Sequence, residues 1–115
     1  MPDCIFCRIV SGEIPATVVA RTPHAVAFRD LNPQAPTHIL VIPTEHVATI
    51  ADLAGDPGER TLGSVMGMAA EVARQVGLAG PGFRLVVNAG ADGGQTVGHL
   101  HVHLLGGRQM TWPPG

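Results

Sequence analysis

Aromatic residues, cationic side chains and long apolar runs are all scarce in this chain of 115 residues. Aromatic residues make up 3% of the chain and tyrosine is absent, so few rings are available on which successive bases of a strand could stack. The formal net charge of -2 excludes a strongly basic surface, although a pocket for one nucleotide is compatible with it. No uninterrupted apolar run approaches the length of a membrane span. The composition therefore predicts neither a long nucleic-acid partner nor a membrane partner.

Cysteine is also scarce, and the first residues lack the pattern of an export signal. The two cysteines, Cys4 and Cys7, are too few and too close together for a secreted disulfide framework. They are therefore free thiols, a redox pair or metal ligands. The N-terminus has no basic region followed by an apolar run and a small-residue cleavage site. We expect a cytoplasmic protein whose residues 1–115 form a single domain.

Apolar periodicity predicts five short strands and two helices. A two-turn helix over 4–11 is stopped by Gly12, and one long helix runs from about Gly58 to Val76. The strands are predicted at 17–21, 25–29, 38–42 and 83–88, with a last strand beginning at His99. This pattern is typical of an α+β domain with a five-stranded, mainly antiparallel sheet.

Half of the six histidines fall within the last strand, as His99, His101 and His103. In an extended strand these three side chains share one face, and the aliphatic residues between them share the other. Histidines on the wet face of an edge strand are the simpler interpretation, but three stacked imidazoles would repel one another when protonated. We therefore predict an apolar face on the core and an imidazole face on a cleft.

Three histidines on one face support two chemistries. A neutral imidazole can attack phosphorus while its neighbours donate hydrogen bonds to the phosphate and the leaving group. Alternatively, three nitrogens can hold a zinc ion with an open position for water. The spacing does not separate the two. The loop before the strand favours phosphate, because glycine amides and side-chain donors can surround an oxyanion there, at Asn88, Gly94, Gln95 and Thr96.

At this point the sequence resembles the histidine-triad (HIT) family, and within it the Hint branch of nucleotide-binding phosphoramidases. The triad run ends in two hydrophobic residues, as in that family. The likeness extends over nearly the whole chain, at Cys4–Ile9, Ile14–Pro15, Ala27–Asp30, Pro33–His38, Val41–Pro43, Val87–Asn88, Asp92–Gln95, Gly106–Met110 and Trp112–Gly115. The resemblance implies a HIT-like fold whose sheet continues across a homodimer, joined through the long helix and a central strand.

The resemblance also implies roles for individual residues. His101 would be the nucleophile, His103 would contact the phosphate, and His99 and His38 would orient the nucleophile. Asp30 would accept the ribose hydroxyls, although a carboxylate there could instead cap the turn before Asn32. Phosphate would be held at Asn88, Gly94, Gln95 and Thr96, and the purine would lie between Ile5, Phe6, Ile9, Phe28 and Leu31. For Ile9 and Phe28, plain core packing explains the residue type about as well.

The activity implied is hydrolysis of the P–N bond of purine nucleoside 5'-phosphoramidates through a nucleotidyl-histidine, with no cofactor required. The alternatives are a dinucleoside polyphosphate hydrolase or nucleotidyl transferase of the wider family, and a purine nucleotide-binding regulatory protein with little catalysis. Two departures from the family pattern bear on the site. Thr96 replaces a common serine, and Gly98 replaces an aromatic residue, which loosens the approach to His99.

The two cysteines add a metal site to what the family resemblance implies. Many bacterial relatives place zinc on the cysteine pair, on a histidine equivalent to His46 and on the first triad histidine, here His99. Such a site would be structural, because all four ligands come from the protein. The alternative is a pair of reduced thiols beside the purine pocket and a surface His46.

Overall fold

The computed structural model describes residues 3–115, which form five strands, two α-helices and one 3-10 turn. In chain order the elements are α1 (Ile5–Ser11), β1 (Val18–Arg21), β2 (Ala25–Arg29), β3 (Thr37–Pro43), η1 (Ile50–Asp52), α2 (Gly55–Gln75), β4 (Phe83–Val87) and β5 (Val102–Gly106).

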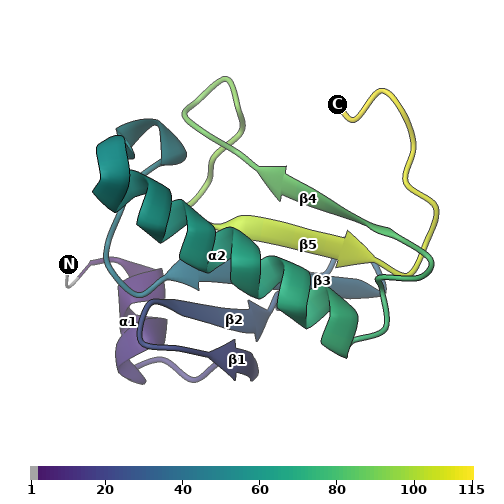
Figure 1. The fold of residues 1–115 in the computed structure, drawn as a ribbon, viewed down its shortest axis with the longest axis horizontal. Coiled ribbons are helices and arrows are strands. Elements are labelled where there is room, and N and C mark those ends of the chain that lie inside the picture. Colours follow the sequence, from purple (N-terminus) through teal and green to yellow (C-terminus); the bar gives the residue numbers. More distant parts are fainter. Residues whose placement is uncertain (1–2) are drawn as a thin grey trace.

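The five strands form one antiparallel sheet in the order β1-β2-β3-β5-β4. Helix α2 crosses one face over β2, β3 and β5, whereas α1 lies behind the sheet and β4 forms its outer edge (Figure 1). The predicted α+β class, the strand count and the antiparallel pairing are confirmed. No helix within residues 3–115 combines the length and apolar character needed to cross a membrane.

Two apolar cores lie on opposite faces of the sheet. The larger one packs α2 against alternate residues of the strands, including Val102 and Leu104. The smaller one packs Phe6 and Ile9 of α1 against Phe28 and its neighbours. Because side chains alternate along a strand, His103, which lies between Val102 and Leu104, faces the α1 side. The second core therefore forms the floor of the cleft on which the histidines lie.

The short helix α1 begins and ends where its sequence indicates. Cys4 is the N-cap, and its Sγ accepts the backbone N–H of Cys7 at 3.4 Å. Gly12 ends the helix in a left-handed conformation, with φ of 82°. The long helix α2 starts three residues earlier than predicted, at Gly55. Pro57 is tolerated there because the first helical turn has no intrahelical partner for its N–H groups.

The prediction that the last strand begins at His99 is wrong: β5 begins at Val102. Strand β4 ends at this point, because Val87 is its last residue and pairs with Val102. Strand β3 pairs with Val102 through Val41 and continues two residues further, to Pro43. The N–H of Leu100 donates instead to Val47 O, at 2.6 Å. His99 and His101 thus lie in a segment leading into the strand, and only His103 lies in the ladder.

Candidate functional site

Most residues predicted to bind nucleotide surround one pocket of about 260 Å³ between α1 and the sheet. Most of its lining is apolar, and its polar lining residues are Arg29, Asp30, Thr96, His101 and His103. Leu31 stands at the rim with 97% of its surface exposed. Among the predicted nucleotide-binding residues, Asn88, Gly94 and Gln95 do not line the pocket. Those that do are Ile5, Phe6, Ile9, Phe28, Asp30, Leu31, Thr96, His101 and His103.

The backbone fixes the tautomer of His101. Its Nδ1 lies 2.8 Å from the carbonyl oxygen of His99, and a carbonyl can only accept, so Nδ1 carries the proton. In the neutral ring Nε2 then holds a free lone pair. The ring is 4% exposed and packs edge-on against Phe6, with ring centres 5.3 Å apart. In its neutral form, His101 is thus oriented to act as a base or nucleophile through Nε2.

A second chain of hydrogen bonds fixes His38 and His103. The backbone N–H of Gln34 donates to His38 Nδ1 at 3.0 Å, so the proton of neutral His38 is on Nε2. That nitrogen lies 2.9 Å from His103 Nδ1, which must accept. The proton of neutral His103 is therefore on Nε2, leaving a hydrogen-bond donor beside His101, whose ring centre is 5.0 Å away.

Burial favours the neutral form of both His103 and His38. It is the main cause that lowers the pKa of His103 to about 4, and the neighbouring His101 and His38 act in the same direction. Burial also lowers the pKa of His38, although Asp30, whose Oδ2 lies 3.5 Å from His38 Nε2, opposes that shift. Asp30 Oδ1 meanwhile accepts the N–H of Asn32 at 2.8 Å. One carboxylate oxygen therefore caps the turn, and the other faces the histidines.

The glycine-rich loop is held by its own side chains. Asn88 Nδ2 donates to Gly93 O at 2.7 Å. Gln95 Nε2 donates to Ala48 O and Val97 O, while its Oε1 accepts the N–H of Gly90. A Cβ at Gly93 would lie 2.3 Å from a backbone oxygen, so only glycine fits there. The Asn88 and Gln95 amides thus shape the loop beside Thr96, and their predicted contact with phosphate stays a prediction.

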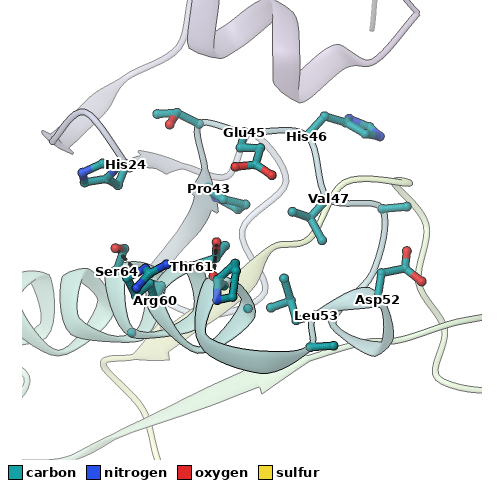
Figure 2. Close-up of a pocket in the computed structure, with 16 residues that line it drawn as sticks. His24, Pro43, Glu45, His46, Val47, Asp52, Leu53, Arg60, Thr61 and Ser64 are labelled. Atoms are coloured by element: carbon teal, nitrogen blue, oxygen red, sulfur yellow. Dashed lines mark hydrogen bonds between the residues drawn. The ribbon is translucent and has the colours of Figure 1, made fainter.

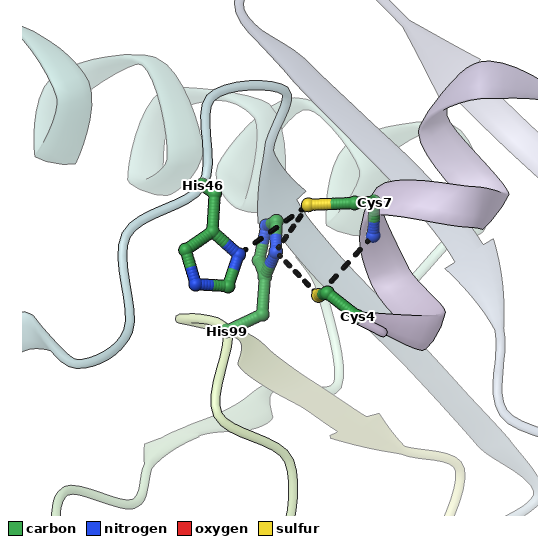
Figure 3. A group of neighbouring side chains, drawn as sticks. All are labelled: Cys4, Cys7, His46 and His99. Carbon is green, nitrogen blue, oxygen red and sulfur yellow. Dashed lines mark hydrogen bonds between the residues drawn. The ribbon is translucent and has the colours of Figure 1, made fainter. Parts of the chain in front are cut away.

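Four predicted metal ligands meet at the N-terminus of α1. Cys4 Sγ and Cys7 Sγ lie 3.3 Å and 3.6 Å from His99 Nδ1, and Cys7 Sγ lies 3.3 Å from His46 Nδ1 (Figure 3). The four ligand atoms are all within 4.8 Å of one another. These residues, Cys4, Cys7, His46 and His99, are called the Cys2His2 cluster below. The structure therefore brings together α1, the loop after β3 and the segment before β5.

The chemistry of the Cys2His2 cluster fits zinc. His99 Nε2 lies 3.0 Å from Pro43 O and so carries the proton, which leaves the Nδ1 lone pair facing the sulfur atoms. Tetrahedral zinc sets sulfur and nitrogen ligands about 3.6 Å apart, close to the separations here. Burial raises the pKa of the Cys7 thiol, and a bound cation would reverse that shift. His99 is fully buried, although a glycine precedes it at position 98.

A larger hollow of about 920 Å³ lies elsewhere, between α2 and the loop that follows β3. Figure 2 shows Glu45 and Val47 above it and Arg60, Thr61 and Ser64 of α2 below. It contains none of the triad histidines, and His46 alone is shared with the Cys2His2 cluster. The smaller pocket, which contains His101 and His103, is therefore the candidate site.

Four groups that orient the histidines could not be identified from the sequence. Three are backbone atoms, namely the N–H of Gln34 and the carbonyl oxygens of Pro43 and His99. The fourth is Arg108, whose Nη2 donates at 3.0 Å to the carbonyl oxygen of Gln34, the residue whose N–H holds His38. Residue type gives no signal for backbone atoms. Arg108 lies within the segment Gly106–Met110 that carried the family resemblance, and that was the only hint of its importance.

Comparisons with known proteins agree with this geometry. The HIT domain family matches residues 11–110. The crystal structure of a HIT family hydrolase from Legionella pneumophila superposes with a TM-score of 0.94 and 53% identity, covering 98% of this chain and all (100%) of that one.

Two curated relatives bear on function. A purine nucleoside phosphoramidase from Escherichia coli is 44% identical over 108 residues, which is 94% of this chain and 90% of the relative. A 14 kDa zinc-binding protein from Zea mays is 51% identical over 112 residues, which is 96% of this chain and 87% of the relative. Both similarities therefore extend over nearly the whole of this chain.

Proposed function

This chain belongs to the HIT family of hydrolases, and from that premise we propose that it hydrolyses the P–N bond of purine nucleoside 5'-phosphoramidates. The observation that carries the proposal is the free Nε2 lone pair of His101, fixed by the carbonyl of His99 at the polar end of an apolar, purine-sized pocket. The phosphoramidase similarity supports the substrate class. We propose residues 1–115 as one HIT domain; its cytoplasmic location stays a prediction.

In the proposed reaction His101 Nε2 attacks the phosphorus atom. A new N–P bond forms, and the amine departs with the electron pair of the old P–N bond and takes up a proton from solvent. The oxygen of a water molecule then bonds to phosphorus as the N–P bond to His101 breaks, and that water returns a proton to solvent. This step releases the nucleoside monophosphate and restores the imidazole. The proton on Nδ1 stays directed at the His99 carbonyl, which stabilises the positive charge that develops on the ring. No cofactor enters these steps.

His103 supplies a neutral hydrogen-bond donor in this reaction. Its Nδ1 accepts from His38, so its Nε2–H is free to donate to a phosphate oxygen or to the departing nitrogen. Because His103 is neutral, it does not compete for the proton on His101, and the two rings keep different roles. The Asp30 oxygen that does not cap the turn is assigned to the ribose hydroxyls.

Removing the nucleophile tests the proposal. His101→Ala should lower turnover of an adenosine 5'-phosphoramidate by at least about 10³-fold. His24→Ala is the matched control, since His24 lies in the turn between β1 and β2, outside the pocket, and should keep wild-type turnover. A rapid quench followed by mass spectrometry should locate an AMP adduct on His101. Wild-type turnover by His101→Ala would disprove the mechanism.

The same assays separate the alternative functions. Faster turnover of diadenosine polyphosphates than of phosphoramidates would identify a dinucleotide hydrolase. Calorimetric binding of AMP without turnover of any phosphoramidate would identify a regulatory nucleotide-binding protein. Loss of activity on chelation, with the fold intact, would point to a metallohydrolase.

We also propose that the Cys2His2 cluster holds a structural zinc ion. Cys4, Cys7, His46 and His99 would be its ligands, and the ion would tie α1 to the loop after β3 and to the segment before β5. The similarity to a zinc-binding protein supports this proposal. The zinc supplies folding energy when bound, because all four positions are taken by protein atoms and none is left for water.

We propose further that the protein is a homodimer joined through β4 and α2. Strand β4 is an unpaired edge, Phe83 is 39% exposed, and Leu85 and Val87 are only partly buried beside α2. Pairing of β4 with a second copy would continue the sheet and remove that edge. Analytical ultracentrifugation should give twice the mass of the chain for wild type and a weakened dimer for Phe83→Glu. A monomeric wild type would refute the homodimer.

A further inference from the structure

The first turn of α1 lies between the Cys2His2 cluster and the nucleotide pocket. Cys4 and Cys7 face the cluster, and Phe6 between them faces the pocket. The rest of the helix is held by other contacts, because Arg21 Nη2 donates to Val10 O at 2.6 Å and the N–H of Ile14 donates to Arg8 O. The cluster therefore governs the position of this turn in particular.

Phe6 contacts one histidine of the Cys2His2 cluster, His99, and one histidine of the pocket, His101. Its ring meets that of His99 edge-on at 5.9 Å between centres and that of His101 at 5.3 Å, with interplanar angles of 74° and 84°. A third edge-on contact, at 5.5 Å, is with Phe28 across the pocket. Any shift of the first turn of α1 thus moves the pocket wall and the ring that packs on the proposed nucleophile.

We propose that Phe6 is a positioning residue that couples the Cys2His2 cluster to the nucleotide pocket, so that a metal ion and a nucleotide bind with positive cooperativity. The proposal rests on the proposed function for the identity of the pocket. A helix of seven residues is marginal alone, and without a metal its first turn is held to the cluster by weak sulfur hydrogen bonds. Metal binding fixes that turn and presses Phe6 against His101.

A second route between the two sites passes through the backbone. His99 is a cluster ligand, and its carbonyl accepts the Nδ1–H of His101. A change at the cluster could therefore reach His101 without Phe6. The two routes are separable by substitution, because shortening the Phe6 side chain leaves the His99 carbonyl in place.

Calorimetric titration of AMP into zinc-loaded and metal-depleted protein tests the coupling. Wild type should bind AMP about tenfold more tightly when loaded, a typical coupling between linked sites. Phe28→Leu is the matched control, since Phe28 lines the same pocket and has no ring contact with His99 or His101. It should weaken AMP binding in both states and keep the tenfold ratio, whereas Phe6→Leu should bring the ratio close to one.

Two readouts independent of turnover complete the test. By reciprocity, saturating AMP should raise zinc affinity by the same factor, measured by competition with a chelator. The NMR signals of the His101 ring, which is not a cluster ligand, should shift on addition of zinc in wild type and in Phe28→Leu, but not in Phe6→Leu. Circular dichroism should show that the metal-depleted protein keeps its fold.

Several results would overturn the coupling. These are no zinc uptake by wild type, equal AMP affinity in the two states, or unfolding of the metal-depleted chain. Retention of the full ratio by Phe6→Leu would assign the coupling to the His99 backbone instead. Tenfold coupling without phosphoramidate turnover would leave this inference standing and remove the proposed activity, so the two failures are distinguishable.

Discussion

Two groups of side chains flank His101. In each group a backbone atom forms a hydrogen bond with one histidine ring, but the type of backbone atom differs. In the group formed by Asp30, His38 and His103, a backbone N–H occupies the Nδ1 lone pair of His38, so the opposite nitrogen must donate. In the Cys2His2 cluster a backbone carbonyl takes the Nε2–H of His99, so the opposite nitrogen offers a lone pair.

This difference gives the two groups different chemistry. Both have ligand atoms within 4.8 Å of one another. A metal on His38 Nε2 would require the proton to move to Nδ1, where it would face the N–H of Gln34, donor against donor. His99 can bind a metal through Nδ1 with no such conflict. Distance alone therefore does not distinguish a hydrogen-bond relay from a metal site, whereas the tautomer does.

The strongest way to break this comparison is to remove the sulfur ligands. The double variant Cys4→Ser, Cys7→Ser should lose the single zinc per chain and unfold at a lower temperature, because metal binding energy is folding energy. His38→Ala should keep its zinc. Metal analysis and thermal melting measure both effects. Zinc retained by the serine variant, or lost from His38→Ala, would contradict the division between the two groups.

Removing His103, the hydrogen-bond donor of the group formed by Asp30, His38 and His103, should affect catalysis and leave the metal content unchanged. His103→Ala should lower kcat by about 10²- to 10⁴-fold, the usual contribution of a positioned proton donor or acceptor, and keep the zinc. His46→Ala is the counterpart in the other group and should lose zinc while keeping kcat at saturating substrate. Equal kcat values for the two variants would refute the assignment of roles.

The pH dependence of folding stability tests whether His103 is the neutral donor that distinguishes its group from the Cys2His2 cluster. His103 has its pKa lowered to about 4 in the folded protein, against about 6.5 in an unfolded chain. Below pH 6.5 the unfolded chain takes up a proton that the folded protein does not. Stability is therefore full above about pH 6.5 and falls as the pH drops toward 4. NMR titration should place the His103 midpoint near 4, and urea unfolding should follow the loss; a midpoint near 6.5 would contradict the neutral donor.

The smallest expected effect concerns Arg108, which bonds the residue whose N–H holds His38. Arg108→Ala removes the bond to Gln34 O and should lower kcat by at most about fivefold, because an exposed interaction of this kind contributes up to about 1 kcal/mol. Arg84→Ala is the matched control, since Arg84 donates to Thr111 O in the same tail and does not touch Gln34. The same loss of kcat in both variants would assign the effect to the tail.

Residue pattern was enough to predict most of the fold, whereas most members of the site were proposed from the family resemblance. Alternation placed Val102 and Leu104 on the core side, and the spacing of apolar residues placed α1 and α2. The start of β5 depends on where β4 ends beside it and on the bond from the N–H of Leu100 to Val47 O, and neither can be read from the local sequence. The roles of His99, His101 and His103 came from family resemblance, since their spacing is symmetrical.

The sequence by itself determined the α+β class, the antiparallel strands, the imidazole-bearing face and the residue types of both groups, because these follow from local periodicity and side-chain chemistry. Only the tertiary structure decided which nitrogen of each histidine carries the proton. That choice depends on Gln34 N–H, Pro43 O and the His99 carbonyl, which are backbone atoms that every sequence possesses and that folding alone brings to each ring.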